Sequence, residues 1–278
     1  WLDKKWAMNS ASKIFPHSES IRKYWEAAWN TYIVFCSPYN DVWNILRDEY
    51  ALAIERIGMP SVVKTTTADP DERLAEHLMA FYASGKFTFT DSASSLVKFY
   101  RKASPRLCGH ALQSVGRNLH ATKSRVEPKV IERFKALWKW RMQEMLQPPG
   151  PAAHAEELAA FGWWFGSQKF DDRWALAQLS EVLKYIGKPK PDFIIVEHLA
   201  RLSPVEPMEA VKCLRMLIEG DERGYLILSH KEDIRKILDT AIHSGNAQSH
   251  RAAVRLVNNL AVRGFDEFGE LIRNVSSA

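Results

Sequence analysis

Cysteine is scarce in this 278-residue chain, which contains only three. Cys36, Cys108 and Cys213 lie far apart and form no CxxC pair. This spacing excludes a disulfide framework and a cysteine-based zinc knuckle, and it predicts three small, buried hydrophobic side chains. The pattern is typical of a reducing compartment, so we expect a cytoplasmic location.

Glycine, proline and long apolar runs are limited as well. The 13 glycines and 13 prolines are few for an all-β protein with many tight turns, and they favour helices. No apolar run approaches the roughly 18 residues that span a bilayer, and no secretory signal opens the chain. We therefore expect no membrane partner. The chain begins with Trp1 inside an amphipathic stretch, which indicates a fragment of a longer polypeptide.

Recognised catalytic and cofactor motifs are absent. The sequence contains no GxxxxGK[ST] loop, GxGxxG fingerprint, HExxH, GxSxG or EF-hand loop. His243 and His250 flank a predicted turn at Gly245, but no cysteine or carboxylate pair accompanies them, so we expect no metal there. We predict a non-enzymatic protein without catalytic residues, cofactor or metal. A hidden enzyme stays open as an alternative, because catalytic groups meet in space rather than along the chain.

Apolar residues recur at spacings of three and four along most of the chain, which predicts an all-α fold. Proline, glycine and serine interrupt this pattern and set the expected helix ends. The first predicted helix begins at Ile21 and ends before Pro38, and Thr65–Pro70 is a polar connector. The other predicted helices cover about 41–58, 71–85, 92–102, 104–121, 128–145, 152–166, 171–186, 191–203, 206–219, 230–243, 247–263 and 265–274.

The predicted helices form antiparallel pairs that recur about every 35 to 40 residues, as in HEAT, armadillo and tetratricopeptide-like arrays. No strict consensus repeats, so we predict an irregular HEAT/armadillo-like α-solenoid. Pro148-Pro149-Gly150-Pro151 is the clearest break and predicts a linker or kink at 148–151. It separates helical-repeat halves 1–147 and 152–278 of one continuous array. A helical bundle that is not a solenoid is the main alternative.

Positive charge is concentrated in one segment. Residues 98–141 contain twelve Lys or Arg and only two acids, Glu127 and Glu132, for a net charge of +10 in a chain of net charge +5. Such a segment can attract an anionic partner, although many basic stretches are simply solvated helix faces. The candidate contacts to nucleic acid or another anion are Arg101, Arg106, Arg117, Lys123, Arg125 and Arg133.

Ten tryptophans are many for this length and predict large rings buried in several places. Trp138 lies on an apolar helical stripe and is expected in the core. Trp140 lies off that stripe and is a candidate partner contact. In Gly162-Trp163-Trp164-Phe165-Gly166 the adjacent rings must face different neighbours, and the glycines allow close helix approach. Asn258-Asn259 resembles the asparagines with which armadillo repeats hold extended peptides, which makes this pair a second candidate contact.

Several sequence blocks together resemble a known protein family. They are Ser37-Pro38-Tyr39 with Leu46-Arg47-Asp48-Glu49-Tyr50, His77-Leu78-Met79-Ala80-Phe81-Tyr82, His110-Ala111-Leu112 with Val115-Gly116-Arg117, Leu137-Trp138-Lys139-Trp140-Arg141, and Glu157 to Phe165 continuing into Lys169-Phe170-Asp171-Asp172. Nearly the whole chain is similar to the C-terminal helical-repeat region of very large, mostly uncharacterised bacterial proteins. The N-terminal parts of those proteins often resemble STAND- or NACHT-type signalling NTPases or other defence-like effector modules.

The resemblance implies a helical-repeat sensor or scaffold at the end of a larger machine, which could serve antiviral defence. It carries over no catalytic residue, and the missing nucleotide-binding loop agrees with an enzymatic part outside this chain. The first functional hypothesis is therefore an interaction module that binds a protein, either another domain of its parent or a foreign protein. The alternative is nucleic-acid binding through segment 98–141.

Overall fold

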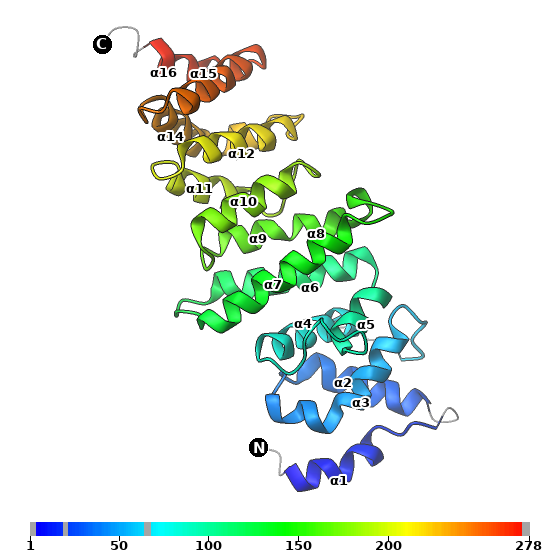
Figure 1. The fold of residues 1–278 in the computed structure, drawn as a ribbon. Helices are drawn as coiled ribbons and strands as arrows, with labels where there is room; N and C mark the ends of the chain where they lie inside the picture. Colours follow the sequence, from blue (N-terminus) through cyan, green and yellow to red (C-terminus); the bar gives the residue numbers. More distant parts are fainter. Residues whose placement is uncertain (1–3, 19–21, 64–67, 274–278) are drawn as a thin grey trace. The chain divides into compact units, whose positions relative to one another are not determined.

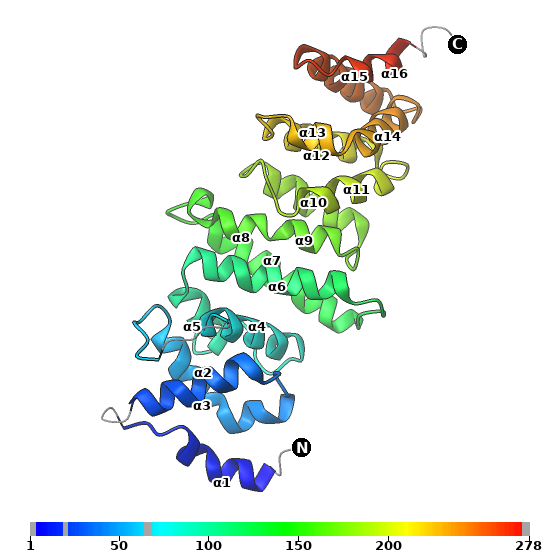
Figure 2. The ribbon, with the colours of Figure 1, turned by 180° about the vertical axis from the view of Figure 1, so that it is seen from behind.

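The computed structural model describes residues 4–18, 22–63 and 68–273 (Figures 1 and 2). These residues form helices and connecting loops and contain no strand, which confirms the predicted all-α class. The chain divides into two compact units. Unit 1 contains Trp1–Val115 and Val126–Gln147, and unit 2 contains Gly116–Arg125 and Pro148–Ala278. No helix in the described ranges is long and apolar enough to cross a membrane.

Unit 1 is built from two rows of helices. Helices α2, α4 and α7 contact one another in sequence, and α1, α3 and α5 form a second row against them. Helix α6 begins in unit 1 and continues into unit 2 from Gly116. The bounds are α1 (Lys4–Ile14), α2 (Arg22–Phe35), α3 (Asn40–Arg56), α4 (Pro70–Ala83), α5 (Ser95–Lys102), α6 (Pro105–Ala121) and α7 (Pro128–Met145).

Unit 2 also has two rows, α9–α11–α14 and α10–α12–α15, which contact each other along their length. Short elements complete it. The bounds are η2 (Pro151–His154), α8 (Ala155–Ala159), α9 (Phe161–Gly166), α10 (Asp172–Leu183), α11 (Asp192–Leu202), α12 (Pro207–Glu219), α13 (Tyr225–Ser229), α14 (Lys231–Ile242), α15 (Ala247–Val262), η3 (Asp266–Gly269) and α16 (Glu270–Arg273).

Capping side chains begin several of these helices. Asp69 accepts from the backbone N–H of Asp71 at the start of α4, and Asp171 accepts from that of Trp174 at the start of α10. Asn246 caps α15 in the same way. Each carboxylate or amide oxygen satisfies an N–H group that has no partner inside its helix. No helix crosses 148–151, since α7 ends at Met145 and η2 begins at Pro151.

The structure differs from the expected helices in a few places. The segment 152–166 is divided into η2, α8 and α9, and 265–274 into η3 and α16. Helices α1 and α13 were not predicted. The expected starting residue Ile21, the end at 274 and residues 65–67 of the Thr65–Pro70 connector lie outside the described residues.

An aromatic cluster forms much of the core of unit 1. The rings of Trp25 and Trp29 on α2 stack with centroids 5.7 Å apart, and Trp29 meets Tyr50 of α3 edge-on at 5.1 Å. Trp43 packs against Phe81 of α4. In unit 2, Trp164 stacks on Phe170 and is fully buried. Aromatic pairs in these geometries stabilise beyond the area they bury.

Candidate functional site

An apolar groove of about 560 Å³ lies in unit 1 between α1, α2 and α3. None of the described residues that line it is charged. Its walls include Ala7 and Ala11 from α1 and Ala27 and Ala28 from α2, whose short side chains leave the space open. The hydroxyl of Thr31 also faces the groove wall but donates to the carbonyl of Ala27, so it presents little polarity.

Large apolar side chains at the groove are exposed to solvent. Trp6 is 56% exposed and Phe35 is 72% exposed, although both line the groove. Exposed aromatic residues grouped around an apolar hollow mark an interaction surface more often than scattered ones do. The groove is therefore the main candidate for contact with a partner.

Cys36 lies at this groove and is exposed, so the expectation that all three cysteines are buried was wrong for it. It follows the last residue of α2, Phe35, which also lines the groove and is exposed. The other two expectations are confirmed. Cys108 is buried, and Cys213 is buried with burial raising the pKa of its thiol to about 12.

A buried polar chain lies beneath the groove. The hydroxyl groups of Tyr32 and Tyr50 are 2.9 Å apart, and the Tyr50 hydroxyl is 2.7 Å from Nδ1 of His77. Burial raises the pKa of Tyr32 to about 12 and lowers the pKa of His77 to about 4, with a further lowering of the latter by Arg73. At neutral pH all three groups are therefore uncharged. They connect α2, α3 and α4 by hydrogen bonds.

Two of the predicted anion-contact residues, Arg106 and Arg133, already form ion pairs or hydrogen bonds within unit 1. Arg106 forms ion pairs with Glu72 at 2.6 Å and Asp69 at 3.4 Å. Arg133 is half-buried, and its guanidinium donates to the carbonyl of Ala83 at the end of α4. Arg141, also in the basic segment, is buried with its guanidinium 4.3 Å from the Tyr100 ring centroid.

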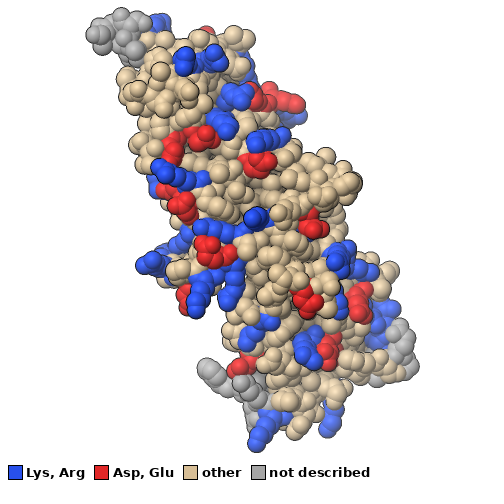
Figure 3. All heavy atoms as spheres, in the orientation of Figure 1, with Lys and Arg blue, Asp and Glu red and all other residues tan. Residues whose placement is uncertain are grey.

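The other predicted anion contacts are exposed. Arg101 lies in unit 1 on α5, while Arg117, Lys123 and Arg125 belong to unit 2 at and beyond the end of α6. In unit 2 the loop that holds Lys123 and Arg125 also receives Lys169, which donates to the carbonyl of Ser124. On the face drawn in Figure 3, Lys and Arg side chains are interspersed with Asp and Glu.

The predicted partner contacts have different surroundings. Trp140 is half-buried, with its ring stacked on Phe89 at 5.2 Å and edge-on to Tyr100 at 5.4 Å. Asn258 and Asn259 are both exposed on α15. The exposed face of this helix continues through Arg251 and Arg255. The structure thus leaves the two asparagines open to a partner and places most of the Trp140 ring among its neighbours.

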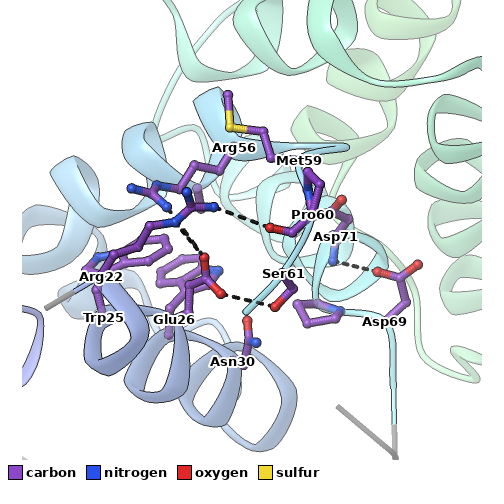
Figure 4. A pocket seen from close by; sticks show the side chains of 13 residues that line it. Arg22, Trp25, Glu26, Asn30, Arg56, Met59, Pro60, Ser61, Asp69 and Asp71 are labelled. Atoms are coloured by element: carbon purple, nitrogen blue, oxygen red, sulfur yellow. Dashed lines mark hydrogen bonds and ion pairs between the residues drawn. The ribbon is translucent and has the colours of Figure 1, made fainter. Parts of the chain in front are cut away.

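A polar pocket of about 220 Å³ lies on the opposite side of α2, between that helix, the end of α3 and the start of α4 (Figure 4). Glu26 is buried in its wall. The Glu26 carboxylate accepts from Arg22 at 2.9 Å, from the backbone N–H of Val62 at 2.6 Å and from Ser61 at 3.2 Å. Burial alone would raise the pKa of Glu26, but the N–H of Val62, with Arg22 and Ser61, lowers it overall.

The sequence analysis did not identify this pocket. Its residues come from positions 22–30, 53–61 and 69–71, and no short motif joins them. The one available signal was the Asp69-Pro70-Asp71 helix start, which reads as an ordinary cap.

No group of three or more His, Cys, Asp or Glu residues with metal-binding geometry occurs within the described ranges. His243 and His250 do not converge on a ligand site. Nδ1 of His243 bonds to the carbonyl of Asp239, and Nδ1 of His250 bonds to that of Ile242. His198 is buried in unit 2 with Nδ1 2.8 Å from the carbonyl of Phe165. These histidines therefore have structural hydrogen bonds.

Comparison of the chain with protein-family models, with curated proteins and with solved structures yields no match. The described residues define an all-α protein whose unit 1 contains an apolar groove and a polar pocket.

Proposed function

We propose that this chain is a non-enzymatic interaction module that binds a protein partner, as part of a larger bacterial protein. The apolar groove between α1, α2 and α3 carries the proposal. Its uncharged lining and its exposed aromatic residues suit a partner that covers them on binding.

The occupant that best suits the groove is an amphipathic helix. The α1 wall extends from Trp6 to Ile14, which at a rise of about 1.5 Å per residue is about 12 Å, or slightly more than two helical turns. A helix presents apolar side chains over that length at positions i, i+3, i+4 and i+7. Its backbone can approach closely where Ala7 faces Ala27 and Ala28 across the space.

The HEAT/armadillo-like architecture belongs to the same proposal. In both units helices contact the second helix after them, as α2–α4 and α3–α5 do in unit 1 and α10–α12 and α12–α14 do in unit 2. Such contacts are typical of stacked helix pairs that bury one another's apolar stripes. Antiparallel pairs stacked in this way would form an irregular α-solenoid that offers its helices to a partner.

Nucleic-acid binding through segment 98–141 stays an alternative prediction. Arg101, Arg117, Lys123 and Arg125 are exposed, which favours it. The ion pairs of Arg106 and the hydrogen bond from half-buried Arg133 to the Ala83 carbonyl reduce the charge available for phosphate contacts. A nucleic-acid site would show an affinity that falls steeply with salt concentration, because phosphate contacts release counterions.

A displayed library of amphipathic helical peptides, selected for binding to the purified chain, tests the groove. We expect selected peptides to lose at least tenfold in affinity for the double variant Ala27→Glu/Thr31→Glu, because two carboxylates would be buried under the bound helix. Both side chains are exposed, so the fold should tolerate the changes.

The matched control is Ala136→Glu, which places a carboxylate at an exposed alanine of α7 outside the groove. This variant should bind the selected peptides as the parent chain does. Circular dichroism checks that all proteins keep their helices. A failure to select any peptide, or peptides that bind the double variant unchanged, would contradict the proposed use of the groove.

A further inference from the structure

The polar pocket of Figure 4 separates opposite charges across a small space. Arg22 and Arg56 come from α2 and α3 on one side, and Asp69 and Asp71 come from the start of α4 on the other. At about 220 Å³, the pocket is smaller than the 300 to 1,000 Å³ typical of sites for drug-sized ligands. It therefore suits a ligand of only a few heavy atoms.

Glu26 holds the cationic side in position. Its carboxylate accepts from Arg22 and lies 3.5 Å from the Arg56 guanidinium, which in turn sits 5.2 Å from the Trp25 ring centroid. The Arg22 guanidinium also donates to the carbonyl of Pro60. These contacts fix the directions of two planar guanidinium groups, which is the arrangement that recognises a carboxylate.

On the acidic side, the carboxylate of Asp71 is half-buried and accepts only a weak hydrogen bond. Burial raises the pKa of Asp71, the N–H of Gly58 lowers it through a long 3.4 Å hydrogen bond, and neighbouring Asp69 raises it. Asp69 pairs with Arg106 at 3.4 Å, whereas Asp71 has no ion pair among the described residues. A cationic group placed beside Asp71 would supply the missing counter-charge.

Two further polar groups line the pocket without a bond inside the protein. Trp29 is 4% exposed, and its indole N–H has no acceptor in the described part of the chain. The side-chain amide of Asn30 has no hydrogen bond there either. A ligand in the pocket that accepts from the indole N–H and bonds to the amide would use both groups.

We propose that this pocket binds a free α-amino acid, with its carboxylate held by Arg22 and Arg56 and its ammonium held by Asp69 and Asp71. When Arg106, which pairs with Asp69, is included, three guanidinium groups balance three carboxylates. A ligand that carries both charges therefore fits better than a simple anion or a simple cation. The side chain of the amino acid lies toward Met59 and Trp29 at the apolar part of the wall. This site is separate from the groove and does not depend on the proposed function.

The test is a titration of the ¹⁵N-labelled chain with each of the twenty L-amino acids, followed through the tryptophan indole signals. A Trp29→Phe variant assigns the signal of Trp29. We expect at least one amino acid to shift this signal saturably. The matching amine without the carboxylate, and the matching acid without the ammonium, should each bind at least tenfold more weakly. The proposal is overturned if no amino acid shifts the signal, or if either analogue binds as well as the amino acid.

Variants then locate the ligand. Asp69→Asn keeps a capping side chain at α4, and Asp71→Asn is isosteric, so both should fold. Each should weaken amino-acid binding at least tenfold through loss of the charge. The control Asp48→Asn changes a side chain that is 83% exposed and outside the pocket, and it should bind normally. The groove variant Ala27→Glu/Thr31→Glu should also bind normally, which distinguishes failure of this proposal from failure of the other.

Discussion

Trp138 and Trp163 provide a test of burial at the scale of single residues. Trp138 on α7 is 0% exposed, whereas Trp163 on α9 is half-buried with its ring edge-on to His120. We expect Trp138→Ala to lower the free energy of unfolding by about 3 to 5 kcal/mol, because it removes a fully buried ring and leaves a cavity. Trp163→Ala should cost less, about 1 to 3 kcal/mol, because part of the ring is already in water.

Urea unfolding followed by circular dichroism measures both losses. Trp6→Ala is the matched control, because it removes a ring of the same size that is more than half exposed. An equal loss for Trp138→Ala and Trp6→Ala would contradict the assignment of Trp138 to the core.

The local spacing of apolar residues was enough to predict that Trp138 is buried. It was not enough to predict the hydrogen-bond and ion-pair partners of Arg106 and Arg133. The partners of Arg106 and Arg133 are Glu72 and the Ala83 carbonyl, which lie 34 and 50 positions earlier in the chain. No short-range pattern connects such pairs. Cys36 was misassigned for the same reason, since its exposure depends on how α1 packs near α2 and α3 rather than on its own neighbours in sequence.

At the scale of elements, the positions of the helices were predicted more completely than the contacts of single residues. Prolines at the first turns of α4, α6, α7 and α12 and the interruptions between apolar stripes placed most helix ends within a few residues. Helix α13 has only five residues, too few for a helical period to appear. The break between α8 and α9 lies at Ala160, which carries no proline or glycine signal.

Close contact between elements explains one glycine of the Gly162-Trp163-Trp164 stretch. A Cβ atom added at Gly162 would overlap the backbone carbonyl of Lys190 and lie 2.9 Å from Cδ1 of Ile195. The expected close approach at this glycine is thus confirmed within unit 2. We expect Gly162→Ala to destabilise the chain by about 1 to 3 kcal/mol, because the backbone of the 188–191 loop must move away.

Thermal or urea unfolding of Gly162→Ala measures this cost. Gly269→Ala is the control, since a Cβ atom there would meet nothing within 4 Å. If both variants unfold alike, the contact between α9 and the loop at Lys190 is not tight in solution.

At the scale of the whole molecule, the apolar spacing of three and four predicted the all-α class, whereas the grouping of the helices into units depends on long-range contacts. Residues 116–125 belong to unit 2 although the proline-rich break lies later, at 148–151. Sequence composition cannot show this grouping, because it depends on contacts of α6 such as Gly116 against Trp163. The polar pocket is a similar case, since three separate segments meet there.

Each unit contains a buried neutral histidine, so acid should destabilise the whole chain. Burial lowers the pKa of His77 in unit 1 and of His198 in unit 2 to about 4, and Arg73 and Arg201 lower them further. In the unfolded chain both rings return to the ordinary value near 6.5. As the pH falls from about 6.5 to 4, the unfolded chain therefore takes up protons that the folded chain does not bind.

The free energy of unfolding is therefore unaffected by the titration of these histidines above pH 6.5. It decreases toward pH 4 by up to about 1.4 kcal/mol per pH unit for each histidine. Urea unfolding between pH 4.5 and 7 measures this slope. His77→Gln and His198→Gln should each flatten it, because glutamine does not titrate. If neither variant changes the dependence of the unfolding free energy on pH, both rings already bind protons in the folded chain. Water would then reach the interior of both units.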